Sequence, residues 1–124
     1  MEEYVTCREG DVWRLPFPDD YFDVVVSARF VHTVGMEFGQ KTVAAAAERM
    51  RVIREFVRVL KGGGIGVVWD LMHVREYVQR LHELKMEDVR VSERVTAYIV
   101  SNHIVSFQKP RHYVSMLWVQ VKLD

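Results

Sequence analysis

The feature that most constrains the fold is a long helical pattern between two short β-branched runs. The runs are FDVVVSA at residues 22–28 and IGVVW at residues 65–69. Compact runs of this kind are typical of strands that are buried on both faces of a sheet. A strand, a helix and a second strand in this order form a right-handed crossover, which makes the two strands parallel. We therefore expect an α/β fold with a parallel sheet covered by helices on both sides.

The segment from Thr42 to Leu60 has the periodicity of a single helix. Its charged residues are expected to form a solvated face, on which Glu48 and Arg51 are spaced as a supporting pair. The apolar residues that recur at helical spacing, and that we expect to face the core, are Val43, Ala46, Ala47, Met50, Ile53, Val57 and Leu60.

Four glycines follow this helix in RVLKGGGIGVVWD, residues 58–70, and invite comparison with a nucleotide-binding loop. A phosphate cradle follows a strand and opens a helix, so that backbone amides face the phosphate. Here the order is inverted, because the helix precedes the glycines and a strand begins at about Ile65. We interpret the glycines as a helix-to-strand turn, with Lys61 complementing the helix dipole at the carboxyl end.

The rest of the chain predicts further elements of the same fold. A short strand is expected at residues 4–9, a second helix at 73–85, and two strands within 87–95 and 98–110. Because these last two strands are close in sequence, we expect them to form an antiparallel pair. Residues 111–124 follow as an extension that either covers an exposed sheet edge or has no fixed place.

Composition excludes several classes of protein. The chain has 17 lysines and arginines and 17 aspartates and glutamates, so it carries no net positive charge that would favour binding to nucleic acid. No apolar run reaches the roughly 18 residues of a membrane span. Cys7 is the one cysteine, which excludes an internal disulfide, and no signal peptide is visible. We expect an intracellular protein, in the cytoplasm or, as the alternative, in an organelle. We expect no metal site because the histidines and Cys7 lack ligand spacing.

Two stretches carry a family resemblance. GDVWRLPFPDDYFDVVVSARFVHTV, residues 10–34, and IREFVRVLKGGGIGVVWD, residues 53–70, resemble class I S-adenosylmethionine-dependent methyltransferases. They are most similar to the group that includes the ubiquinone and menaquinone biosynthesis enzymes. The resemblance covers about residues 4–110, and Gly62 stands where the family usually has proline, a change expected to loosen the turn without moving it. It implies S-adenosylmethionine as cofactor and methyl transfer to a small molecule.

The resemblance also implies that only part of the family fold is present. The family sheet has the strand order 3-2-1-4-5-7-6, and this chain matches strands three to seven. It lacks the first two strands and the glycine-rich loop, so residues 1–110 are expected to be the carboxyl-terminal portion of a methyltransferase domain. The strand at 22–28 would then have an unpaired apolar edge, open to self-association or to pairing with a full-length relative.

Site residues follow from the resemblance, position by position. Asp11 matches the acidic residue that accepts a hydrogen bond from the adenine amino group, and Val12 the neighbour whose backbone amide faces the ring. Ser27 matches a residue placed against the cofactor, while Arg29 and His32 lie where a substrate meets the methyl donor. Three of them have a structural alternative: Asp11 as a turn former, Ser27 as a hydroxyl bonded to backbone, and His32 without a chemical task.

Two functions therefore stay open at this point. One is methyl transfer from S-adenosylmethionine, impaired in this chain if it is truncated, with His32 orienting or deprotonating the acceptor. The other is a non-catalytic remnant or isoform that associates with a full-length methyltransferase through its open sheet edge. The sequence contains no signal that identifies the methyl acceptor.

Overall fold

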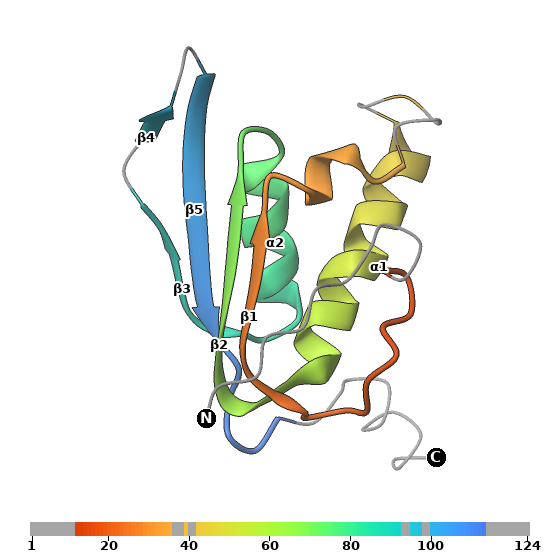
Figure 1. Ribbon diagram of the computed structural model, residues 1–124, viewed down its shortest axis with the longest axis vertical. Helices are drawn as coiled ribbons and strands as arrows, with labels where there is room; N and C mark the ends of the chain where they lie inside the picture. Colours follow the sequence, from red (N-terminus) through yellow and green to blue (C-terminus); the bar gives the residue numbers. More distant parts are fainter. Residues whose placement is uncertain (1–11, 36–38, 40–41, 93–94, 98–99, 114–124) are drawn as a thin grey trace.

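The computed structural model describes residues 12–35, 39, 42–92, 95–97 and 100–113 (Figure 1). The strand expected at residues 4–9 and the end of the carboxyl-terminal extension lie outside these residues. The elements in chain order are β1 (Phe22–Ala28), the 3₁₀ turn η2 (Val31–Thr33), α1 (Val43–Val59), β2 (Leu60–Asp70), α2 (Val74–Glu83), β3 (Glu87–Val91), β4 (Val95–Ala97) and β5 (Val100–Gln108).

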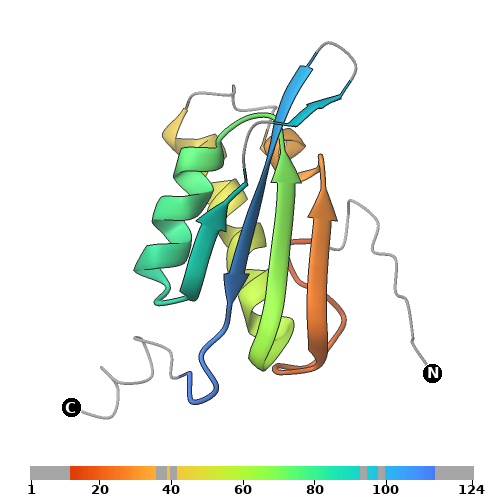
Figure 2. The same cartoon turned by 90° about the vertical axis from the view of Figure 1, so that its left-hand side faces the viewer.

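The strands form a mixed sheet in the order β1-β2-β5-β3, with β4 pairing β5 (Figure 2). β1 and β2 are parallel, as the helix between them predicts, whereas β5 is antiparallel to both β2 and β3. The last strand is thus inserted between the second and the third. This order corresponds to strands 4-5-7-6 of the methyltransferase sheet, and the expected partial Rossmann-like fold is confirmed.

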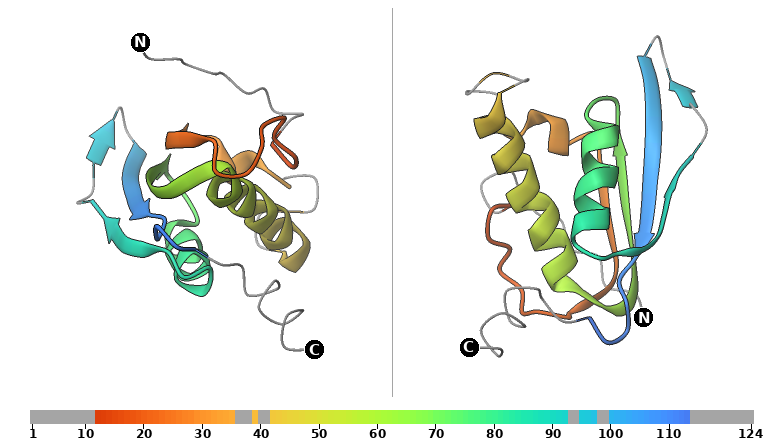
Figure 3. Two further views of the ribbon diagram at one scale, coloured as in Figure 1. Left: turned by 90° about the horizontal axis from the view of Figure 1, so that it is seen from below. Right: turned by 180° about the vertical axis from the view of Figure 1, so that it is seen from behind.

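The sheet is covered on one face only in the part of the chain that the structure describes. Both helices lie on the same side of the sheet (Figures 2 and 3). On the opposite face Val24, Val26 and Ile65 are 56%, 65% and 48% exposed, and Val24 is paired with Ile65. The prediction of a strand buried on both faces is therefore wrong for β1. A continuous apolar run cannot show which of its two faces another element covers.

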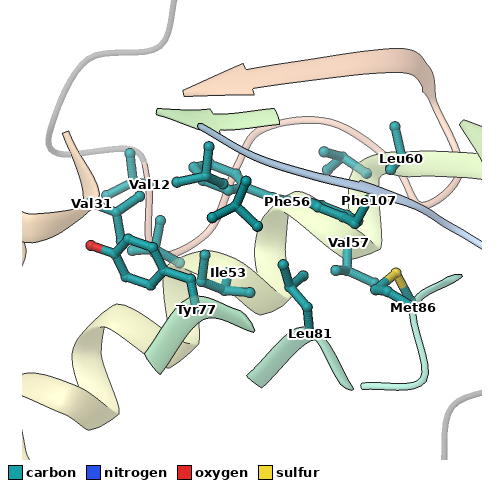
Figure 4. Packing of buried hydrophobic residues seen from close by; sticks show 14 of the residues in the cluster. Val12, Val31, Ile53, Phe56, Val57, Leu60, Tyr77, Leu81, Met86 and Phe107 are labelled. Carbon is teal, nitrogen blue, oxygen red and sulfur yellow. The ribbon is translucent and has the colours of Figure 1, made fainter. Parts of the chain in front are cut away.

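The helix α1 has nearly its predicted bounds, and Ile53, Val57 and Leu60 are buried as predicted, but the other predicted core positions are not fully buried. Its amino terminus is capped by Thr42, whose hydroxyl accepts a hydrogen bond from the Ala45 amide at 3.1 Å. Val43 is 86% exposed, although the periodicity assigned it to the core. Four successive alanines made the apolar face ambiguous. The residues of α1 that are buried, several of them shown in Figure 4, are Ala45, Arg49, Val52, Ile53, Phe56, Val57 and Val59.

The glycines follow α1 as predicted, but β2 begins at Leu60, directly after the helix, so they lie inside this strand and not in a turn before a strand that begins at Ile65. β1 pairs Phe22 with Leu60 and then Val24 with Ile65, so residues 61–64 bulge out of the register. Gly63 has a φ of +86°, which favours glycine. A Cβ on Gly62 would lie 2.5 Å from the carbonyl oxygen of Arg111. Since the chain passes this close, the glycine that replaces the family's proline permits a contact rather than only loosening the turn.

A lysine does lie at the carboxyl end of α1, but it is not the one predicted. Lys109 is 4% exposed, and its Nζ donates to the carbonyl oxygens of Val57 and Leu60, both at 2.8 Å. Lys61 instead has a side chain that is 48% exposed and lies 3.5 Å from Asp23. The role assigned to Lys61 was therefore wrong, because β5 brings a more deeply buried ammonium group to the same carbonyls.

Candidate functional site

The carboxyl ends of the parallel strands β1 and β2 meet at one edge of the sheet. Ser27 is paired with Val68 and Ala28 with Trp69, one residue before β2 ends at Asp70. In open α/β sheets, ligands bind beyond the carboxyl ends of the strands. The side chains that lie here are therefore the first candidates for a functional site.

The centre of this edge is the carboxylate of Asp70, which is fully buried. Its Oδ1 lies 2.6 Å from Nδ1 of His32 and accepts a hydrogen bond from the Leu71 amide at 2.8 Å. Its Oδ2 accepts from the His32 amide at 2.9 Å and from the Tyr77 hydroxyl at 2.8 Å. Both oxygens are thus hydrogen-bonded, as a buried carboxylate requires.

Two residues with positive φ bring these groups together. Arg29 has a φ of 56° and turns the chain out of β1 into η2, while its amide donates to the Trp69 carbonyl at 2.6 Å. This turn carries His32 across the end of β2. His73 has a φ of 63° and begins α2, which places Tyr77 one helical turn further on, over Asp70. Histidine is among the residues that tolerate this conformation best.

The electrostatic environment keeps Tyr77 protonated. Burial raises the pKa of the Tyr77 hydroxyl well above its ordinary value, and the neighbouring Asp70 carboxylate raises it further. Tyr77 is therefore a hydrogen-bond donor to Asp70 at all physiological pH values. Burial also lowers the pKa of the nearby His73 imidazole, and the positive charge of Arg49 acts in the same direction.

A buried ion pair joins the two helices beside the site. Arg49 of α1 donates from Nε and Nη2 to Glu76 of α2, at 2.7 and 2.9 Å. The Arg49 side chain is only 3% exposed, and its pKa is raised chiefly by these hydrogen bonds. Arg49 also interacts electrostatically with Asp70, so its charge offsets part of the cost of burying that carboxylate.

The predicted site residues have different outcomes. Asp11 lies outside the described residues. Val12 is buried in the same core cluster as Val31 and Tyr77, and Figure 4 shows all three. Ser27 is buried at the end of β1, and Arg29 is exposed just beyond it. The structure thus brings Ser27, Arg29 and His32 to one edge of the sheet, while the roles assigned to them stay predictions.

Sequence reasoning missed Asp70 and Tyr77. Asp70 ends the second β-branched run, and parallel strands bring their carboxyl ends together, so its position could have been inferred from the pattern. Tyr77 carried no such signal, since it has the same spacing as other apolar residues of α2. Among the described residues, His, Cys, Asp and Glu side chains do not gather in a group that could hold a metal ion. Nor is any helix there long and apolar enough to cross a membrane.

Two comparisons with known proteins bear on the family of this chain. A family model described as a methyltransferase domain matches residues 1–68. The comparison with curated proteins gave no match.

Solved structures share the fold at low sequence identity. A SAM-dependent methyltransferase from Thermotoga maritima, a possible histamine N-methyltransferase, is 14% identical with a TM-score of 0.61 over 79% of this chain and 61% of its own. The [4+2]-cyclase SpnF is 17% identical with a TM-score of 0.59, over 81% of this chain and 54% of its own. The N-methyltransferase NodS from Bradyrhizobium japonicum, solved with S-adenosyl-L-homocysteine, is 16% identical with a TM-score of 0.55, over 81% and 52%. The chain therefore spans between about half and two thirds of the length of these structures.

Proposed function

The chain belongs to the methyltransferase domain family, and on that premise we propose that it takes part in methyl transfer from S-adenosylmethionine to a small molecule. The observation that carries the proposal is the meeting of Ser27, Arg29 and His32 at the carboxyl ends of β1 and β2. The fold alone would not suffice, because the similar SpnF structure is named a cyclase.

The proposed cofactor site combines residues before β1 with a residue at its carboxyl end. Asp11 and the backbone amide of Val12 would hold the adenine, and Ser27 would lie against the cofactor. One structural observation supports the fit: the indole Nε1 of Trp13, next to Val12, is buried and has no hydrogen-bond partner among the described residues. A buried donor is thus present beside the residue whose backbone amide is proposed to face the adenine. The bound cofactor would supply a methyl group activated by its sulfonium, and the protein would supply alignment.

The finer assignments belong to the same proposal. The order of motifs in residues 10–34 and 53–70 supports membership of the ubiquinone and menaquinone biosynthesis group. The chain covers 54% and 61% of two solved structures, which supports its being a portion of a longer protein, and the match of its motifs to strands three to seven supports the carboxyl-terminal portion. We accordingly propose that residues 1–110 carry this portion and that cofactor affinity is weak in the isolated chain.

Calorimetric titration of the purified chain with S-adenosylmethionine tests the proposal. We expect saturable binding that Asp11→Ala weakens and that the matched control Asp23→Ala, an exposed aspartate of β1, leaves unchanged. Equal affinity in the wild type and Asp11→Ala would contradict the adenine assignment. No binding at millimolar cofactor would contradict a cofactor-binding chain and leave the second candidate.

The second candidate is a non-catalytic partner of a full-length methyltransferase. The observation that favours it is β1, which has a strand on one side only in the described sheet and exposes Val24 and Val26 on its uncovered face. Such an edge is open to pairing with another chain. Sedimentation at increasing concentration should show association that Val26→Lys abolishes, while Val43→Lys, at a more exposed valine of α1, has no effect. A monomer at all concentrations, with and without a full-length methyltransferase, would contradict this role.

A further inference from the structure

We propose that a groove beside α2 binds an amphipathic carboxylate, a molecule with an unbranched apolar chain and one anionic head group. The groove has a volume of about 1080 Å³, and its lining shares no residue with the candidate site at the ends of β1 and β2. The inference therefore goes beyond the proposed function and does not depend on it.

The groove lies where α2 ceases to cover the sheet. The right-hand view of Figure 3 shows α2 over β2, while β5 and β3 extend beyond the helix. Val91 of β3 and His103 of β5 form the sheet side of the groove. They are paired with Val105 and Asp70, which are fully buried, so both lie on the face that the helices cover. The groove is thus bounded by one helix and two strands.

Three valines form the floor of the groove. Val74 and Val78 are one helical turn apart on α2, and both pack against the core. β2 and β3 run in the same direction, because both are antiparallel to β5. Since α2 returns along β2, Val91 at the end of β3 lies near the start of α2 (Figure 2). Val91 is 46% exposed although it lies on the covered face, so a ligand placed over it would remove apolar surface from water.

The start of α2 also brings an unpaired positive charge to the groove. Arg75 is exposed and forms no ion pair with another described residue. The two acidic residues of α2 are engaged elsewhere, Glu76 by Arg49 at 2.7 and 2.9 Å and Glu83 by Arg80 at 2.9 Å. The guanidinium of Arg75 is therefore open to an anion, and a carboxylate can accept two parallel hydrogen bonds from it.

Lys85 is the second cation of the groove and lies just beyond the last turn of α2. The carboxyl end of a helix carries partial negative charge, so an anion is favoured at Arg75 and not at Lys85. The helical rise places Lys85 about 15 Å from Arg75. An apolar chain held at Arg75 would extend over Val78 toward the methylene stem of Lys85.

An unbranched apolar chain suits this groove better than a peptide does. A peptide would bury amide and carbonyl groups against the three valines, and such groups cost free energy when they have no hydrogen-bond partner. The backbone groups of α2 are engaged within the helix and cannot supply these partners. An alkyl chain has no polar groups to satisfy, and its head group remains at the polar end of the groove.

The test is a titration of the full chain with sodium dodecanoate, followed by amide NMR spectra and kept below the concentration at which dodecanoate forms micelles. We expect saturable shifts at Val74, Val78 and Val91. Arg75→Gln should weaken binding about fivefold. Val91→Glu, which places a like charge on the floor, should abolish it. The matched control Arg90→Gln, at an exposed arginine of β3 outside the groove, should leave the affinity unchanged.

Two further ligands separate the roles of the head group and the chain. Acetate has the carboxylate without the chain and should give no saturable shifts. Dodecyltrimethylammonium has the same chain with a cationic head and should bind more weakly than dodecanoate. Equal affinity for the two head groups would overturn the proposal.

The uncovered face of β1 is the competing apolar surface, and Val26→Glu tests it. This variant should bind dodecanoate as the wild type does. Shifts confined to that face, an equal affinity in Arg75→Gln and Arg90→Gln, or no binding of dodecanoate would overturn the proposal. Arg75 and Val91 are both exposed, so their variants should keep the fold, which the dispersion of the same spectra checks. A failure of the chain to bind S-adenosylmethionine would overturn the cofactor proposal alone.

Discussion

Nζ of Lys109, at the end of β5, lies 2.8 Å from the carbonyl oxygen of Leu60, where α1 passes into β2. The same ammonium donates to Val57 and to the carboxylate of Asp20, at 2.8 and 2.9 Å. This one side chain therefore satisfies carbonyls at the carboxyl end of α1 and joins them to the segment that precedes β1.

Replacing Lys109 should destabilise the fold. Lys109→Met removes the donor while keeping an apolar stem, and the loss of hydrogen bonds at buried carbonyls should lower the free energy of unfolding by about 1–3 kcal/mol. Urea unfolding measures the change. The matched control is Lys61→Met, at the exposed lysine of the same turn, which should cost about 0.5 kcal/mol or less. Equal losses for the two lysines would refute the capping role of Lys109.

The ion pair between Arg49 and Glu76 should contribute more to stability than the pair between Arg51 and Glu48 on α1. Arg49→Met leaves the Glu76 carboxylate without its guanidinium and should lower stability by about 2–3 kcal/mol. Arg51→Met removes the partner of Glu48. The Arg51 side chain is 57% exposed and lies 3.5 Å from the Glu48 carboxylate, so this change should cost about 0.5 kcal/mol or less. Thermal unfolding of both variants is the measurement, and a larger effect for Arg51 would be inconsistent with this account.

Gly66 should not tolerate a side chain. A Cβ there would lie 2.1 Å from Cζ of Phe107, which is buried under the helices. Gly66→Ala should therefore cost about 1–3 kcal/mol through overpacking. In the double variant with Phe107→Leu, the smaller side chain makes room, so the combined loss should be less than the sum of the single losses. Strict additivity in urea unfolding would argue against the contact.

The free energy of unfolding should fall as the pH drops below 6.5, the ordinary pKa of a histidine side chain. Burial lowers the pKa of His73 from 6.5, with Arg49 and His32 acting in the same direction and Glu76 and Asp70 opposing. Below pH 6.5 the His73 imidazole is protonated in the unfolded chain, whereas its lowered pKa keeps it neutral in the folded chain. The free energy of unfolding therefore decreases. His73→Asn, which tolerates the positive φ, should flatten this decrease in urea unfolding between about pH 7 and 5.5. The control His82→Asn should keep the slope of the wild type, and an unchanged slope in His73→Asn would refute the assignment.

The order of the elements could be predicted because it depends on local periodicity and on the handedness of crossovers. β1, α1 and β2 were expected in this arrangement, and the antiparallel contact of β3 with β5 followed from their closeness in sequence. The predictions that were wrong concerned contacts between residues far apart in the sequence. The periodicity could not tell that Arg49 would be buried and Val43 exposed, because the partner of Arg49 is Glu76, 27 residues later. The cap by Lys109 involves a separation of 49 residues from Leu60, which no local pattern encodes.

Only the part of the candidate site that depends on local pattern could be predicted. Residues after β1 could be placed at the edge of the sheet, since ligands bind there in this class of fold. The contact between His32 and Asp70 required the positive φ of Arg29, which is not a residue that usually signals a turn of this kind. The turn residues that sequence reasoning recognises are glycine, asparagine and aspartate.

The most direct test of the central claim is the NMR spectrum of the backbone amides during titration with S-adenosylhomocysteine. The account predicts saturable shifts at the ends of β1 and β2, around Ser27, Arg29 and His32, and their loss in Asp11→Ala. Shifts confined to other surfaces, or none at this edge at millimolar ligand, would contradict it.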